Sequence, residues 1–161
     1  MTDEKTFPVG YTESIVHEAN RYHGRLVSVD SGERAPFSDP KGEKEPCGLF
    51  KFRAFSEIGK DGEPVWLTCG EDNLPVFFFY TTGTNYGHPK AKLTTLVNGM
   101  VGRDLTKEET KRLNLFRLQN RDCDLLVGEE ANENDGGSRN VIKGIYPYNN
   151  VPVDASLLLV D

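Results

Sequence analysis

The chain has 161 residues, a length that suits one domain with its own hydrophobic core rather than two. Its 19 Lys and Arg face 25 Asp and Glu, which gives a formal net charge of −6. This charge argues against a protein that coats nucleic acid by bulk charge alone, because such proteins are usually basic. No apolar run approaches the roughly 20 residues of a membrane helix. The polar start Met1–Lys5 is unlike a secretory signal, so we expect a cytoplasmic protein.

The first third of the chain predicts an arm, a strand and a long loop. Residues 1–24 carry mixed signals and are expected to form an N-terminal arm. Residues 25–30 alternate apolar and polar side chains, as a strand does. Residues 31–46 are polar and rich in Gly and Pro around a lone Phe37, which predicts a long loop of the kind that often carries function.

Residues 48–58 give the clearest strand pattern. The period-two alternation places Phe50, Phe52 and Ala54 on one face and Lys51 and Arg53 on the other. An Asp-Gly pair at 61–62 predicts a tight hairpin turn. Residues 64–69 then return as the partner strand, and the extended run 74–82 either forms a further strand or continues the same bent strand after a loop.

The middle of the chain predicts two helices. Residues 93–101 carry apolar side chains at i, i+3, i+4, i+7 and i+8, which form one stripe along a helix. Pro89 precedes this stripe and Gly102 follows it, as is typical of helix ends. The sequence Thr106-Lys107-Glu108-Glu109 is a capping-box pattern that begins a second, short helix.

The last forty residues predict a hairpin and a tail. Residues 124–130 and 139–146 are expected to be strands, and the Asn-Asp-Gly-Gly sequence between them is a strong turn signal. Residues 147–161 are expected to form a C-terminal tail or an extra strand, with an apolar end at Leu157–Val160.

The order of these elements is three strands, a helix and two strands, which is the order of the OB-fold. The sequence therefore predicts a mainly β protein: a five-stranded OB-like Greek-key barrel over residues 25–146, with a helical connector between strands 3 and 4. The alternative is an unrelated small barrel or sandwich with an inserted helix.

Residues 84–106 resemble a group of small phage-borne proteins. The matching sequences are Pro89-Lys90-Ala91-Lys92-Leu93, a Pro-Lys-x-Lys-Leu helix start, and Gly102-Arg103-Asp104-Leu105-Thr106, a Gly-Arg-x-Leu turn. The group also shares the β-hairpin and the final hairpin, so the resemblance extends over roughly residues 25–146. It implies an OB-like fold and a role in single-stranded DNA binding or replication inside the host cell, and it assigns no catalytic residue.

The charge is distributed unevenly. Residues 90–121 contain eight basic and three acidic side chains, a local charge of +5, whereas the rest of the chain sums to −11. A basic block inside an acidic chain is more informative than the net charge. It is either a surface for phosphates or a solvated helical face, and a helical connector usually lies away from the binding face of an OB-fold.

Single-strand binding needs stacking rings and a cationic groove, which an OB-fold supplies on its second and third strands. The candidate binding residues are Lys51, Arg53, Phe55 and Trp66 on those strands, Tyr86 in a loop, and Lys90, Lys92, Lys111 and Arg112 in the basic block. The alternative is that Phe55 and Trp66 only cover the sheet. The acidic residues of the last hairpin would repel phosphate.

Catalytic and metal-binding patterns are lacking in the sequence. The three His and three Cys show no triad or metal-ligand spacing, and no P-loop occurs. We therefore expect a protein that is not an enzyme and that needs no cofactor or metal.

The expected partner is single-stranded DNA, and the C-terminal tail is a candidate contact for replication proteins unless its apolar end docks as a strand. No membrane partner is expected, and a homo-oligomer is compatible with the sequence. The alternative function is a phage-encoded interaction or inhibitor module that acts through acidic surfaces.

Overall fold

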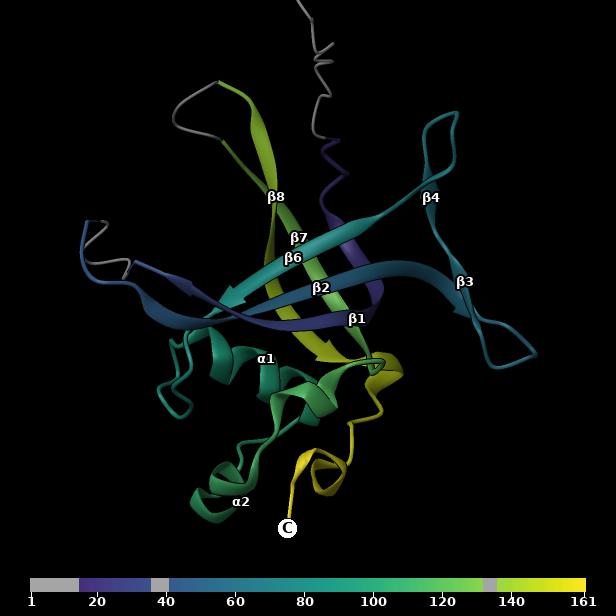
Figure 1. Ribbon diagram of the computed structural model, residues 1–161. Helices are drawn as coiled ribbons and strands as arrows, with labels where there is room; N and C mark the ends of the chain where they lie inside the picture. The colour runs from purple at the N-terminus through teal and green to yellow at the C-terminus, as the bar shows by residue number, and fades with distance from the viewer. Residues whose placement is uncertain (1–14, 36–40, 132–135) are drawn as a thin grey trace, which may run out of the picture.

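The computed structural model describes residues 15–35, 41–131 and 136–161 (Figure 1). Within these ranges the protein is mainly β. The strands are β1 (Asn20–Arg34), β2 (Glu45–Ile58), β3 (Pro64–Trp66), β4 (Thr68–Cys69), β5 (Leu74–Pro75), β6 (Phe77–Thr82), β7 (Asp122–Ala131) and β8 (Ser138–Pro147). The α-helices are α1 (Lys92–Val101) and α2 (Lys107–Arg112), and short 3-10 helices span Leu115–Leu118, Tyr148–Asn150 and Ala155–Leu158. None of the helices in these ranges is long and apolar enough to cross a bilayer.

One antiparallel sheet contains all strands except the small β4–β5 pair. β1 lies along one edge of β2, while β3 and β6 share the other edge. β1 also pairs with β7, and β7 pairs with β8. The two helices lie between β6 and β7 in the chain, where the helical connector was predicted.

The sheet does not close into the barrel that the element order predicted, because no backbone pairing joins β6 to β8 in the described part of the chain. The segment that precedes β1 lies beside β8 at this opening. His17 donates its backbone N–H to Asn140 Oδ1 at 2.8 Å, and Asn140 Nδ2 donates to the His17 carbonyl at 2.8 Å. The His17 ring also meets Phe78 of β6 edge-on. These contacts fill part of the space that a β6–β8 ladder would need.

β3 and β6 are two parts of one interrupted strand, as one of the two sequence alternatives predicted. Leu67 donates its N–H to the Ala54 carbonyl, and Ala54 donates its own N–H to the Val76 carbonyl. The chain therefore leaves β2 and returns to it at the same residue. The β4–β5 hairpin between these points projects away from the sheet (Figure 1).

The predicted loop at 31–46 is shorter than expected. β1 begins at Asn20, inside the predicted arm, and continues to Arg34, which pairs with Glu45 of β2. The end of the β1–β2 hairpin extends beyond the core, so both of its faces are largely exposed and its residues are polar. The alternation of apolar and polar side chains that marks a half-buried strand is therefore weak there. Phe37 lies outside the described residues.

A bulge at Val27 changes the direction of β1. Leu26 pairs with Phe52 but Ser28 pairs with Lys51, so one residue of β1 is inserted into the ladder. Before the bulge β1 pairs with both β2 and β7, and after it with β2 alone. The inserted residue shifts the alternation of β1 by one, so Ser28 and Asp30, opposite Lys51 and Leu49, lie on the same face as Arg25.

The inner face of the sheet and the apolar stripe of α1 form the core. Phe52, Leu26 and Leu125 on the sheet, and Leu96 and Met100 on the helix, are all fully buried. Gly102 ends α1 with φ of 79°, a left-handed conformation that glycine adopts without strain. The helix spans Lys92–Val101, so the predicted range 93–101 is correct within one residue at each end.

The apolar C-terminal end docks against the segment after α2. Leu159 forms a β-bridge with Leu113, and Asn114 donates its N–H to the Leu158 carbonyl. Leu158 is fully buried and Leu159 nearly so. The apolar end is therefore docked, but through a 3-10 helix and a single β-bridge rather than as the extra strand of the sequence alternative. A protein that recruits this end would have to displace it.

The capping box predicted at Thr106 is confirmed. The Thr106 hydroxyl accepts from the Glu109 N–H, and the Thr106 N–H donates to Glu109 Oε1. Arg103 contacts both carboxylate oxygens of Glu109 at 2.8 Å. These hydrogen bonds lower the pKa of Glu109 from an ordinary value of 4.5 to about 2, and the bond from Arg103 makes the largest contribution.

This lowered pKa predicts how the first turn of α2 responds to acid. A depressed folded-state pKa stabilises the protein fully above the unfolded-state value of about 4.5, and the contribution is lost as the pH falls toward 2. In an NMR titration we expect the Glu109 carboxyl to have its midpoint well below 4.5, and Arg103→Leu to raise it. A wild-type midpoint at or above 4.5 would contradict the bidentate contact.

Candidate nucleic-acid interface

Aromatic and basic side chains alternate along the outer face of β2, β3 and β6. The order across this face is Trp66, Arg53, Phe77, Lys51 and Phe79, which we call the stripe. Arg53 Cζ lies 4.5 Å from the centroid of the Trp66 ring system and 6.0 Å from that of Phe77. Lys51 Nζ lies 4.0 Å from the Phe77 centroid and 6.0 Å from that of Phe79. Each cation is thus placed between two rings, within the range of cation–π attraction.

The strand register explains this alternation. In β2, Lys51 and Arg53 point outward because they alternate with the buried Phe50 and Phe52. Across the ladder, Lys51 pairs with Phe79 and Arg53 pairs with Phe77.

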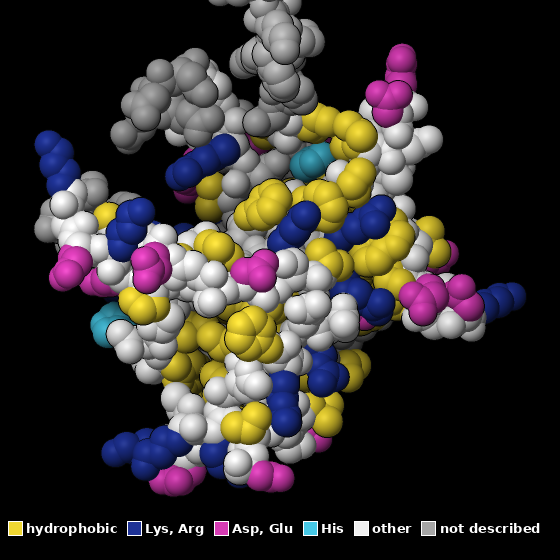
Figure 2. All heavy atoms as spheres, viewed as in Figure 1, with side chains coloured by type: hydrophobic (Ala, Val, Ile, Leu, Met, Phe, Trp, Pro, Cys, Tyr) yellow, Lys and Arg dark blue, Asp and Glu magenta, His cyan; other side chains and the backbone are white. Residues whose placement is uncertain are grey.

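β3 supplies the last ring of the stripe. Trp66 follows on the same edge of β2 and pairs with Phe55. Figure 2 shows hydrophobic and basic side chains interleaved over this part of the sheet.

The two cations of the stripe are free of carboxylates. Among the described residues neither Lys51 nor Arg53 forms an ion pair, and Arg53 Nε is buried without a hydrogen-bond partner. Phe79 is the most accessible ring, with 68% of its surface exposed. The stripe therefore offers unneutralised positive charge beside an exposed ring, the combination that binds a phosphate backbone and stacks a base.

The neighbouring half of the same face, on β1 and β7, is neutralised by ion pairs. Arg25, opposite Arg53, binds both oxygens of Asp122, from Nε to Oδ1 at 2.7 Å and from Nη2 to Oδ2 at 3.1 Å. This hydrogen bonding raises the pKa of Arg25. The nearly buried Asp124 carboxylate contacts Arg21 and His23 Nδ1. These two carboxylates are thus occupied within the sheet.

Phe55, predicted as a binding residue, is covered instead. Its ring is only 1% exposed and packs against His23, Trp66 and Tyr148. Phe55 has the outward phase of Lys51 and Arg53, but the 3-10 turn at Tyr148–Asn150 follows β8 and places the Tyr148 ring against it. The Phe55 ring thus packs edge-to-face against Trp66 and has no exposed face on which a base could stack.

The predicted residues Tyr86 and Lys90 lie away from the stripe, and Lys92 lies beyond its Phe79 end. The Tyr86 hydroxyl donates to Asn98 Oδ1 and accepts from the Leu105 N–H, both at 2.7 Å, so it fastens the loop before α1 to the turn after it. Lys90 is exposed in that loop. Lys92 begins α1, with its Nζ 5.4 Å from the centroid of the Tyr80 ring.

Lys111 and Arg112, also predicted, lie on α2 at the end of the molecule remote from β2 and β3 (Figure 1). Lys111 pairs with Glu108, and Arg112 contacts the Val160 carbonyl and Asp161. In the same block, Arg117 donates to the Leu159 carbonyl. Much of the charge of the basic block thus pairs locally or holds the C-terminal end, which a count of charges along the sequence could not show.

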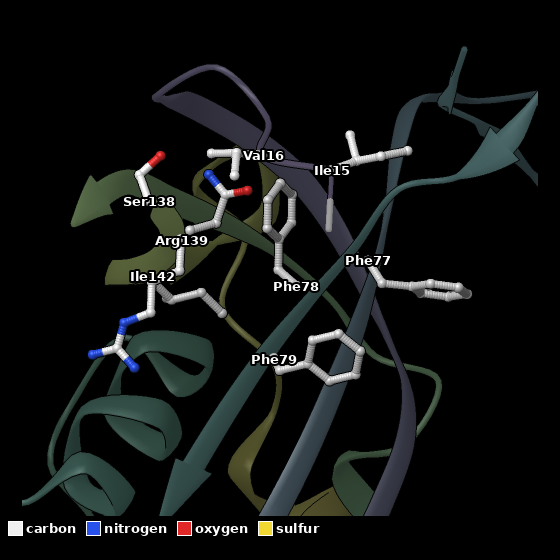
Figure 3. A pocket seen from close by; sticks show the side chains of 9 residues that line it. Ile15, Val16, Phe77, Phe78, Phe79, Ser138, Arg139 and Ile142 are labelled. Atoms are coloured by element: carbon white, nitrogen blue, oxygen red, sulfur yellow. The ribbon is translucent and has the colours of Figure 1, made fainter. Parts of the chain in front are cut away.

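Phe77 and Phe79 were missed as candidates, although the sequence carried a signal. Three consecutive Phe residues in a strand must place at least one ring on each face. In Figure 3 the Phe78 ring points toward Val16, whereas the Phe77 and Phe79 rings point the other way. Phe78 is in the core and 2% exposed, so its two neighbours are the outward pair.

Two pockets line the opening between β6 and β8, beside Phe79. One, of about 280 Å³, is bordered by Ile15, the three Phe residues of β6 and the start of β8 (Figure 3). The other contains Lys92 and Arg139 together with Phe79 and Thr81. Two further cations thus lie beyond the Phe79 end of the stripe.

Comparisons with protein-family models and with curated proteins found no match for this chain.

Proposed function

We propose that this protein binds single-stranded DNA through the stripe on β2, β3 and β6, and that it is not an enzyme. The observation that carries the proposal is the pair of carboxylate-free cations, Lys51 and Arg53, set between the rings of Trp66, Phe77 and Phe79. Phosphates contact the cations, and bases stack on the exposed ring. This is the general design of proteins that bind single strands without a strong sequence preference.

The connectivity of the sheet supports an OB-like assignment, although the sheet is open. A long bent β1 pairs with both β2 and β7, β2 pairs with the interrupted strand β3–β6, and the helices precede the final hairpin. In OB-folds the second and third strands form the binding face, and the stripe lies on the corresponding strands here. With the resemblance of residues 84–106 to phage-borne proteins, this favours a role in phage replication or recombination in the host cytoplasm.

The stripe also reconciles DNA binding with a net charge of −6. Affinity depends on the cations that reach phosphates, and here they are few and local. We therefore expect modest affinity that decreases steeply with salt.

The proposal is tested by titrating the protein with oligo-dT while following the fluorescence of Trp66, the only tryptophan of the chain. Because Trp66 lies in the stripe, we expect its emission to change on binding, at low salt first and more weakly at moderate salt. Absence of binding at low salt would overturn the proposal.

Phe79→Ala tests the stacking contribution. Base stacking is worth about 1–3 kcal/mol by alanine substitution, so affinity for oligo-dT is expected to fall by roughly five-fold or more. Stability is expected to change little because the ring is 68% exposed. Phe116→Ala, which truncates a 58% exposed ring after α2, is the matched control and should bind as wild type does. Equal losses in both variants would remove Phe79 from the site.

A further inference from the structure

The outer face is hollowed beyond the Phe79 end of the stripe. A pocket of about 250 Å³ lies over β1, β2 and β6, and its outward side chains are Ser28, Asp30, Leu49, Lys51, Phe79 and Thr81. Pockets for drug-sized ligands begin at about 300 Å³, so this one suits a group no larger than one nucleobase. The pocket shares Lys51 and Phe79 with the stripe, so a DNA strand bound along the stripe would run past the pocket opening.

The chemistry of the pocket is asymmetric. Phe79 forms an aromatic wall on β6, and the half-exposed Leu49 forms an apolar floor on β2. On β1, Ser28 donates its hydroxyl to Asp30 Oδ2 at 2.9 Å, which orients the carboxylate. Asp30 forms no ion pair among the described residues, so most of its acceptor capacity is unused.

A free carboxylate beside a phosphate path lowers affinity for every single strand. It gains a favourable role where it faces two adjacent N–H donors of a base. Guanine presents N1–H and the N2 amino group side by side, which a carboxylate accepts together, and next to them the O6 acceptor that an ammonium group can meet. Thymine presents one N–H between two carbonyl oxygens, which a carboxylate repels. Asp30 and Lys51 together thus match the Watson–Crick edge of guanine.

The spacing of the strands also favours a purine. Asp30 and Phe79 stand on strands separated by β2, and their register positions also differ by two residues along the strands. With neighbouring strands about 4.8 Å apart and a rise of about 3.4 Å per residue, the two side chains start roughly 12 Å from each other. A base that stacks on Phe79 and reaches Asp30 must span this width, which the two-ring system of a purine does better than a pyrimidine.

We propose that this pocket is a base-recognition subsite that takes one guanine of the bound strand, read by Asp30 and Lys51 against Phe79. The inference rests on the proposed function, since the strand must follow the stripe for a base to reach the pocket. It adds a base preference to binding that stacking and charge alone would leave tolerant of sequence.

The test measures binding of fifteen-nucleotide oligo-dT strands whose central base is thymine, guanine, hypoxanthine or adenine. One bidentate contact discriminates by about 1–3 kcal/mol, so guanine is expected to bind about five-fold to a hundred-fold tighter than thymine. Hypoxanthine keeps N1–H and O6 but lacks the amino group, and should bind between the two. Equal affinities of wild-type protein for all four strands would overturn the subsite and leave oligo-dT binding, and hence the proposed function, intact.

Asp30→Asn distinguishes recognition of guanine by the Asp30 carboxylate from the general effect of its negative charge on DNA affinity. The amide has one acceptor oxygen where the carboxylate has two, and its NH2 group would face one of the two guanine N–H donors. The guanine-to-thymine ratio is therefore expected to fall to about one, while affinity for oligo-dT stays the same or rises. Asp72→Asn, an exposed change at the β4–β5 hairpin, should keep the ratio. If Asp30→Asn also keeps it, Asp30 does not read the base. Failure of wild-type protein to bind any strand would instead refute the proposed function.

Discussion

The double variant Lys51→Ala/Arg53→Ala is expected to lose most of its affinity for single-stranded DNA, by about ten-fold or more at low salt. Each phosphate neutralised on a single strand contributes about −0.7 to the slope of log affinity against log salt. Loss of both contacts should therefore make the slope shallower by about 1.4. Because each cation also lies against a ring, the free energy of unfolding is expected to fall by about 1–2 kcal/mol, which leaves the protein folded at 25 °C.

The matched control is Lys111→Ala/Arg112→Ala, which removes the same charge from α2. The stripe and α2 lie at different ends of the molecule, so this variant should keep both the affinity and the salt slope of wild type. Anisotropy titrations with labelled oligo-dT at several salt concentrations measure both quantities. An effect confined to the α2 variant would move the interface to the basic block.

Gly99→Ala is expected to lower the free energy of unfolding by about 2 kcal/mol. A Cβ at this position would lie 2.7 Å from Ile145 Cβ and closer still to the Ile145 carbonyl oxygen, so α1 would have to move away from β8. Overpacking of this kind costs about 1–3 kcal/mol, and more where backbone must shift. Alanine regains about 1 kcal/mol of helix propensity, which does not offset a backbone clash.

Urea denaturation followed by circular dichroism measures this change. Gly83→Ala is the control, since nothing lies within 4 Å of a Cβ there and the backbone is not left-handed. A variant at Gly99 as stable as wild type would show that α1 does not pack directly on β8.

Local patterns predicted the elements well. The alternation of Phe50 and Phe52 with Lys51 and Arg53 identified β2 and its outward cations, and the Thr106 capping box identified α2. These features depend on residues within a few positions of each other, where period and hydrogen-bonding chemistry are decisive.

Contacts between distant segments could not be read from the sequence. Asp122 neutralises Arg25 only because β1 pairs with β7, almost one hundred residues later. Likewise, the backbone carbonyls near the C-terminus that bind Arg112 and Arg117 have no sequence signature. The basic block therefore looked like a binding surface until its partners were known.

The gap between β6 and β8 was missed for a related reason. Element order suggests a closed barrel, but closure depends on whether two edges meet. Here Asn140 bonds to His17 with its side chain, and the segment before β1 stands beside β8. No local sequence pattern distinguishes an Asn whose side chain bonds to a distant backbone segment, as Asn140 does, from an Asn that is simply exposed.

The β4–β5 hairpin, which leaves the sheet after Leu67 and returns at Val76, is a site where the protein should tolerate insertions. Both ends of the β4–β5 hairpin are fixed to Ala54, so its length can change without altering the register of Trp66 on one side or Phe77 on the other. An epitope, a fluorophore or a fused domain inserted at the hairpin tip would report on the protein while Trp66 and Phe77 keep their spacing on β2. The same arrangement lets sequence drift accumulate there at little cost to the sheet.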